Sequence, residues 1–181
     1  MDPTETLQAV VDAVRTPPKR KRAPGKTSFL RQAEAAGVSE LVVTYKPGRK
    51  PMAERVQIYC AADAAKLTRD LVNQPNEHFV ALLLDAKTRV LTRATVATGT
   101  LVSCPVHPRD VFKLCILGNA VSVIFVHNHP SGDPTPSPED RDVTDRLRQS
   151  GTILGIRVLD HVIVGEPGYY SISDGNFQVW S

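Results

Sequence analysis

The sequence is poor in cysteine and has no long apolar run, and each lack argues against a class of protein. Cysteine occurs three times in 181 residues, an odd number with no close pairing, at Cys60, Cys104 and Cys115. This disfavours a disulfide framework and a cysteine-based zinc knuckle. No apolar stretch approaches the roughly 20 residues that a membrane helix needs. The first 14 residues lack the basic-then-apolar order of a secretory signal. We therefore expect a cytoplasmic protein with no membrane segment.

Positive charge is concentrated in one short stretch. The chain has a formal net charge of +3, yet RTPPKRKRAPGK, residues 15–26, contains six Lys or Arg and no acid. The remainder is therefore mildly acidic. A basic, proline-rich stretch of this kind buries too little apolar surface to order itself. Residues 15–26 are interpreted either as a solubilising linker or as a weak, non-specific contact for nucleic acid.

The pattern of apolar residues predicts three parts. Residues 1–27 form a disordered or partly helical basic arm, 28–58 an accessory helix and hairpin, and 59–181 the main domain. The accessory hairpin would pair LVVTY with ERVQIY across a KPGRKP turn. In the main domain we predict helices and strands in the order helix 61–74, strands 79–85 and 89–98, helix 107–119, strand 121–126, helix 138–150 and strand 156–165. This alternation is typical of an α/β domain with a mixed β-sheet flanked by helices.

Two histidines follow the apolar run VSVIFV, in the stretch HNHPSGDPTPSPED. His127 and His129 are two residues apart, so a strand that continues through them would project both from one face, with Asn128 on the other. Two converging imidazoles are typical zinc ligands, and a catalytic zinc takes a third protein ligand and keeps one position for water. The sequence therefore predicts a third ligand close by.

Asp140 is the preferred third ligand. The prolines that follow the histidines stiffen the return of the chain, and Asp140 then falls in the first turn of a helix. Asp133 is the second choice, although a Gly-Asp-Pro turn favours aspartate for local reasons. Ser137 and Asp140 also fit a capping box, in which the acid stabilises the start of the helix and binds no metal. Both interpretations of Asp140 remain open at this point.

The stretch HNHPSGDPTPSPED resembles the JAMM metalloprotease motif: His-x-His, seven residues, Ser, two residues, Asp. Together with GTLVSCPVHPRDVF before it and VLDHVIVG after it, the text is similar to the bacterial RadC family over roughly residues 59–174. The resemblance implies a JAB1/MPN-type fold and one zinc ion per chain, held by His127, His129 and Asp140. It also implies a catalytic glutamate upstream of the histidines.

Glu77, just before FVALLLD, resembles the catalytic glutamate of that family. A carboxylate there would take a proton from zinc-activated water and pass it to the leaving amine. Glu54 is the other glutamate within reach, but it does not precede a buried strand in this way. The family suggests that Ser137 helps to hold the developing oxyanion. His107 and His161 are interpreted as structural residues or as partners of the ligands.

These features favour a zinc-dependent hydrolase, a metallopeptidase or isopeptidase acting on a peptide or protein. The alternative is a scaffold or DNA-repair module of the RadC family that binds DNA or protein without proteolysis. The tripeptide HNH at 127–129 does not indicate an HNH nuclease, since that motif spreads its three residues over a few dozen positions. The complete ligand set favours the enzyme, because a scaffold has no physical need for it.

Overall fold

The computed structural model describes residues 54–99 and 106–180. The predicted basic arm and most of the accessory segment, including the strand expected at 41–45, lie outside the described residues. The strand predicted at ERVQIY is wrong: residues 54–59 form no strand, and among these described residues Gln57 alone makes a bridge, antiparallel to Arg89. Helix α3 (Ala61–Leu67) begins three residues after Ile58, so the pairing ends before a strand can form.

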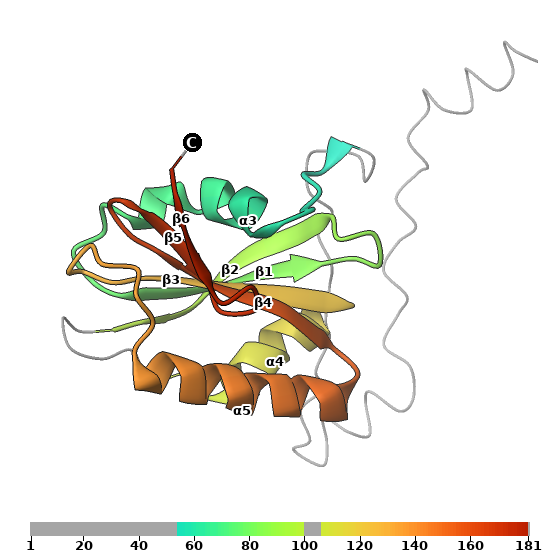
Figure 1. Ribbon diagram of the computed structural model, residues 1–181. Helices are drawn as coiled ribbons and strands as arrows, with labels where there is room; N and C mark the ends of the chain where they lie inside the picture. The colour runs from blue at the N-terminus through green and yellow to red at the C-terminus, as the bar shows by residue number, and fades with distance from the viewer. Residues whose placement is uncertain (1–53, 100–105, 181) are drawn as a thin grey trace, which may run out of the picture. The chain divides into compact units, whose positions relative to one another are not determined.

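The sheet has six strands in the order β2-β1-β3-β4-β5-β6 (Figure 1). Strand β1 pairs antiparallel with both β2 and β3, whereas β3 and β4 are parallel. The strands predicted at 79–85 and 89–98 therefore form an antiparallel hairpin, and the predicted mixed sheet is confirmed. The bounds of the strands are β1 His78–Leu84, β2 Val90–Thr98, β3 Ser122–Asn128, β4 Arg157–Val164, β5 Gly168–Ser171 and β6 Asn176–Val179.

Strands β1 and β3 are buried on both faces, which explains their nearly continuous apolar sequences. Alternate residues serve two separate cores. One face of β3, with Ile124 and Val126, packs toward helix α3 (Ala61–Leu67). The other face, with Val123 and Phe125, packs toward helices α4 (Pro108–Leu117) and α5 (Pro138–Leu154). Figure 1 shows α3 on one side of the sheet and the other two helices on the opposite side.

Two helices end at places that differ from the prediction. Helix α5 does not stop at Gly151 but continues to Leu154, and Gly155 ends it in the left-handed conformation at φ 70°. Gly151 instead permits close packing, since a Cβ atom there would lie 2.5 Å from the carbonyl oxygen of Ile156. Helix α3 ends at Leu67 rather than near residue 74, and a single 3-10 turn follows at Arg69–Leu71.

The short strands β5 and β6 complete the sheet and have no counterpart in the sequence prediction. They form a hairpin beside β4, and Trp180 after β6 donates its indole N–H to the carbonyl of Gly165 at 2.9 Å. Within residues 54–99 and 106–180, no helix is both long and apolar enough to cross a membrane.

Candidate metal centre

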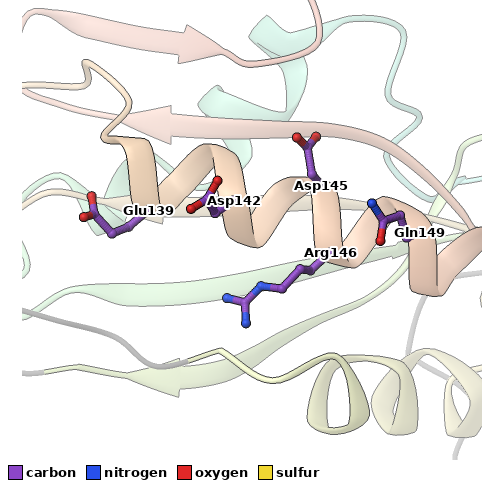
Figure 2. A pocket seen from close by; sticks show the side chains of 5 residues that line it. All are labelled: Glu139, Asp142, Asp145, Arg146 and Gln149. Atoms are coloured by element: carbon purple, nitrogen blue, oxygen red, sulfur yellow. The ribbon is translucent and has the colours of Figure 1, made fainter.

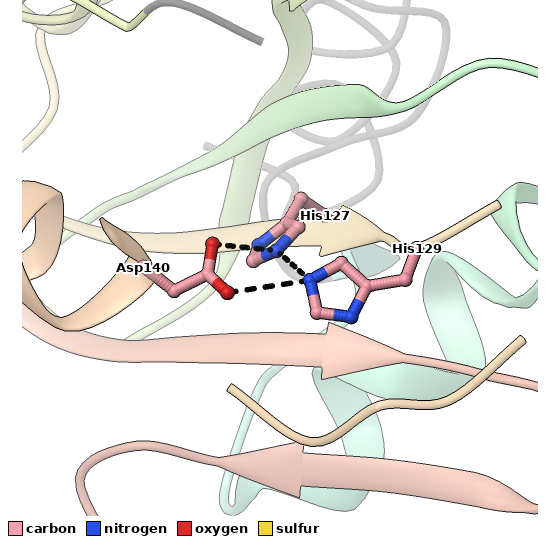
Figure 3. A group of neighbouring side chains, drawn as sticks. All are labelled: His127, His129 and Asp140. Carbon is pink, nitrogen blue, oxygen red and sulfur yellow. Dashed lines mark hydrogen bonds and ion pairs between the residues drawn. The ribbon is translucent and has the colours of Figure 1, made fainter. Parts of the chain in front are cut away.

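Three predicted ligands come together from the end of β3 and the start of α5. Nε2 of His127 lies 2.9 Å from Nε2 of His129. The Asp140 carboxylate approaches both rings, Oδ1 at 3.1 Å from His127 and Oδ2 at 3.3 Å from His129. Figure 3 shows the three side chains pointing at one another. They form a group that could hold a metal ion.

Strand alternation explains why the group forms on this side of the sheet. His127 has the same parity as Val123 and Phe125, whose side chains face the α4 and α5 layer. Helix α5 begins at that layer, so its first turn reaches the histidines. Asn128 projects to the opposite face, as predicted.

The proline-rich segment returns the chain to the histidines because it packs against the end of β4. Pro134 and Pro136 are buried. The Gly132 carbonyl accepts the backbone N–H of Glu166 at 2.8 Å. A Cβ atom on Gly165 would lie 2.3 Å from the Gly132 carbonyl oxygen, so only glycine permits this approach. The stiff segment is therefore held at Gly132 and at its two buried prolines, shortly before α5 starts.

His129 is oriented by a backbone group rather than by a side chain. Its Nδ1 lies 2.7 Å from the backbone carbonyl oxygen of Asp133. A carbonyl oxygen can only accept a hydrogen bond, so the ring proton is on Nδ1 and Nε2 is unprotonated. The Asp133 carboxylate itself accepts from the backbone N–H of Thr135 at 2.9 Å. That side chain is exposed and is not a member of the histidine group.

A chain of three hydrogen bonds fixes which ring nitrogen of His127 carries the proton. The Thr144 hydroxyl donates to the backbone carbonyl of Asp140, one helical turn earlier. Because its own proton is used there, the hydroxyl oxygen accepts from Nδ1 of His161 at 2.6 Å. Nε2 of His161 then accepts from Nδ1 of His127 at 2.8 Å. Nε2 of His127 is therefore left without a proton, as a metal ligand must be.

This arrangement requires His161 to be neutral, and its surroundings keep it so. The ring is fully buried and lies against Phe79 and Phe125, with centroids 5.2 and 6.2 Å away. Burial lowers the pKa of His161 well below its usual range, and the charge of a protonated His127 would lower it further. His161 is thus the partner of a predicted ligand, which was one of its two predicted roles.

The atoms that meet in the group are all acceptors. With both imidazole protons on Nδ1, the two Nε2 lone pairs and the carboxylate oxygens face one gap, where they repel unless a cation lies between them. Ligands held about 2.0–2.1 Å from a tetrahedral zinc are separated by about 3.3 Å, close to the separations found here. Burial opposes protonation of His129, but its pKa is raised above the ordinary value because a protonated Nε2 would donate to the Asp140 carboxylate, and because Nδ1 donates to the Asp133 carbonyl. The donor set fits a metal cation.

Asp140 caps helix α5 and also belongs to the group that could hold a metal ion. Its Oδ2 accepts the backbone N–H of Ser137 at 2.8 Å and the Ser137 hydroxyl at 2.6 Å, and its own backbone N–H donates to that hydroxyl. This is a complete capping box. Burial opposes ionisation of Asp140, but its pKa is held well below the usual range because the rings of His127 and His129, when protonated at Nε2, would donate to the carboxylate. Because the Ser137 hydroxyl donates to Asp140 here, the oxyanion role of Ser137 stays a prediction.

Glu77 lies directly before β1, close enough to interact electrostatically with the group. Burial raises the pKa of Glu77 above its ordinary value; charge on His127 lowers it and charge on Asp140 raises it. A raised pKa favours proton transfer near neutral pH. Glu54, by contrast, is exposed and lines a separate pocket with Val56 and Val90.

Two residues near the group were missed from the sequence, and a third has a purely local role. Thr144 is one helical turn after Asp140, a spacing that could have indicated it. Asn128 gave no signal beyond its parity, because its partners are about 50 positions away. His107 is the N-cap of α4, where its Nδ1 accepts the backbone N–H of Arg109 at 3.1 Å, so it is structural.

A pocket also lies along helix α5. Figure 2 shows its lining side chains projecting from that helix. They are Glu139, Asp142, Asp145, Arg146 and Gln149. None belongs to the histidine group, so we locate the candidate site at the histidines rather than in this pocket.

Comparison with known proteins agrees with the site and the fold. A family model described as the RadC-like JAB domain matches residues 58–177. The six-stranded mixed sheet with helices on both faces is consistent with a JAB-type fold. The chain therefore belongs to the RadC-like JAB domain family.

Curated relatives carry the name UPF0758 protein. The chain is 45% identical to one from Syntrophotalea carbinolica over 144 residues, 78% of this chain and 62% of the relative. It is 51% identical to one from Desulforamulus reducens over 123 residues, 67% and 54% of the two chains. A third, from Geobacillus kaustophilus, is 49% identical over 126 residues, 69% and 56% of the two chains. The chain thus spans a little over half the length of the relatives it matches.

Proposed function

We propose that the protein is a zinc-dependent metallohydrolase, a metallopeptidase or isopeptidase acting on a peptide or protein substrate. The observation that carries this proposal is the convergence of three acceptor side chains whose protons are directed away from the gap between them. One zinc ion per chain would be held by His127, His129 and Asp140. When bound, it would supply an activated water and polarise a substrate carbonyl.

The side chains around the group have the chemistry that amide hydrolysis needs. Glu77 would take a proton from the attacking water and deliver it to the departing nitrogen, a role that a pKa raised by burial favours. Ser137 would be freed to stabilise a developing oxyanion only if its hydroxyl turned from Asp140 toward the substrate.

A library experiment tests the proposal. Purified protein loaded with zinc would be incubated with peptides and with isopeptide-linked peptides, and cleavage would be followed by mass spectrometry. We expect cleavage that a chelator abolishes and added zinc restores. Zinc-replete protein that cleaves no member of a broad library would favour the alternative, a scaffold or DNA-repair-associated module.

The partners of His127 give a prediction that requires no substrate. Replacing Thr144 by valine removes the acceptor for Nδ1 of His161, so the proton on His127 is no longer directed to Nδ1. We expect zinc affinity to fall by about 10- to 100-fold, as is usual when the partner of a metal-bound histidine is lost. Competition with a chromogenic chelator measures this.

Thr68→Val is the matched control for Thr144→Val. The Thr68 hydroxyl is equally buried and also donates to a carbonyl four residues earlier, that of Ala64, but on the other side of the sheet. Its replacement should leave zinc affinity unchanged. Equal affinities for the wild type and Thr144→Val would show that the hydroxyl does not orient the ligand.

A second candidate property, contact with nucleic acid, is favoured by the six cations in residues 15–26. We propose that these residues contact phosphates weakly and without sequence preference. Deleting residues 1–26 should leave zinc content intact and weaken DNA binding, with a smaller dependence on salt concentration. Fluorescence anisotropy with a labelled duplex at several salt concentrations measures this. If the full chain and the truncated chain bound DNA with equal affinity at every salt concentration, residues 15–26 would not contact DNA.

A further inference from the structure

Asn128 lies between the two histidines of the metal group but faces away from them. It has the parity of Ile124 and Val126, so its side chain enters the layer that contains α3. The residue is completely buried. A primary amide in that position is costly unless its polar atoms are hydrogen-bonded. Its partners are therefore informative.

All the hydrogen bonds of the Asn128 side chain go to the segment that carries Glu77. Oδ1 accepts the backbone N–H of His78 at 2.9 Å. Nδ2 donates to the carbonyl oxygen of Asn76 at 3.1 Å, and to that of Gln74 at 3.5 Å. The amide thus binds the backbone groups immediately before and after Glu77.

These contacts define the backbone conformation of Glu77. The Asn76 carbonyl belongs to the peptide group that precedes the Cα atom of Glu77, and the His78 N–H belongs to the one that follows it. When both peptide groups are bound to one rigid amide, the two dihedral angles of Glu77 are restrained, and with them the direction of its side chain.

The segment depends on this support because it has little regular structure. Residues 74–77 lie between the 3-10 turn and β1 and belong to neither. The carbonyl of Glu77 accepts the backbone N–H of Gly99 at 2.8 Å, which ties it to the end of β2. Asn128 ties it to β3, the strand that carries His127.

We propose that Asn128 is a positioning residue that holds Glu77 in register with the metal ligands. The three residues 127–129, at the end of β3 and just beyond it, would then serve both parts of the site: the two histidines would bind the metal, and the asparagine between them would fix the base. The inference rests on the proposed function in that Glu77 is taken to be the base. Its structural part, that Asn128 fixes the direction of Glu77, can be tested without any substrate.

The first test measures the pKa of Glu77 in metal-free protein by 13C NMR of its side-chain carboxyl. In wild type, burial should keep this pKa above the ordinary value. In Asn128→Ser the serine side chain is too short to bind the peptide groups on both sides of Glu77. Glu77 should then turn toward solvent, and its pKa should fall. Val126→Ala is the control, since it removes a buried side chain two residues earlier on the same face of β3. It should leave the Glu77 pKa unchanged.

The second test is a double-mutant cycle on hydrolysis of the library peptides that wild type cleaves. Asn128→Ser should lower kcat by about 10- to 100-fold with little change in KM, as expected for a misplaced catalytic group. Zinc content should stay the same. In the Glu77→Gln background, Asn128→Ser should have no further effect, whereas Val126→Ala should act equally in both backgrounds.

The two tests separate failure of this inference from failure of the proposed function. An unchanged Glu77 pKa in Asn128→Ser would overturn the inference, whatever the activity. The inference would also be overturned if Asn128→Ser lowered kcat by the same factor in the Glu77→Gln background as in the wild type. If wild type hydrolyses nothing, the proposed function fails, and the pKa measurement alone decides whether Asn128 holds Glu77. Should Asn128→Ser not fold, Asn128→Thr provides the second variant for the same measurements.

Discussion

Asp140→Ala should abolish zinc binding while the sheet remains folded. The carboxylate supplies the only negative charge of the grouped residues, and it lies 3.1 and 3.3 Å from the two imidazoles. Without it the remaining pair of histidines falls short of the three protein ligands of a catalytic zinc. We expect zinc, measured by plasma mass spectrometry after dialysis, to fall from about one per chain to near zero. His127→Ala and His129→Ala should have the same effect.

Two controls separate metal binding from helix capping. Asp63 occupies the corresponding capping-box position of α3, where its carboxylate accepts the backbone N–H of Cys60 at 3.2 Å. Asp63→Ala should cost about 1 kcal/mol of stability and leave zinc content unchanged. Asp133→Ala should also retain zinc, because that carboxylate is outside the group. Full zinc in Asp140→Ala would mean that Asp140 only caps α5.

Glu77→Gln should leave shape and zinc content intact and reduce hydrolysis by about 10²- to 10⁴-fold. Glutamine has nearly the size and shape of glutamate, but its amide cannot take the proton of the attacking water. Burial raises the pKa of Glu77, which brings the carboxylate closer to the range where it can both accept and return a proton. Peptide cleavage with zinc quantified in parallel measures the effect.

Glu54→Gln is the matched control for this variant, because Glu54 is exposed and lines a separate pocket. It should retain wild-type activity. Equal activity in wild type and Glu77→Gln would remove Glu77 from the mechanism. Loss of zinc along with activity would instead make Glu77 part of the metal site.

The convergence of His127, His129 and Asp140 could be predicted from the sequence because its determinants are local. His127 and His129 are brought to one side of the chain by strand parity, and the prolines and the capping box bring Asp140 back within a dozen positions. Strands β1, β3 and β4 were also predictable, since their apolar runs are buried, and β2 was predictable from its alternation of apolar and polar residues. Such patterns depend on short stretches of chain.

The features that were missed depend on contacts between distant parts of the chain. Gly151 looked like a helix stop, yet it lies inside α5. A glycine is needed there because the backbone of Ile156 occupies the place where a side chain would be. Asn128 looked like a spacer between ligands, yet it binds backbone groups some 50 residues away. The tautomer of His127 depends on His161, 34 positions later. No local pattern specifies such pairings.

Anomalous diffraction at the zinc edge, on crystals of the purified chain, tests the metal centre most directly. We predict one peak per chain, about 2.0–2.1 Å from Nε2 of His127, Nε2 of His129 and a carboxylate oxygen of Asp140. A zinc-replete crystal with no peak between these three side chains, or with the ion bound elsewhere on the chain, would contradict the account.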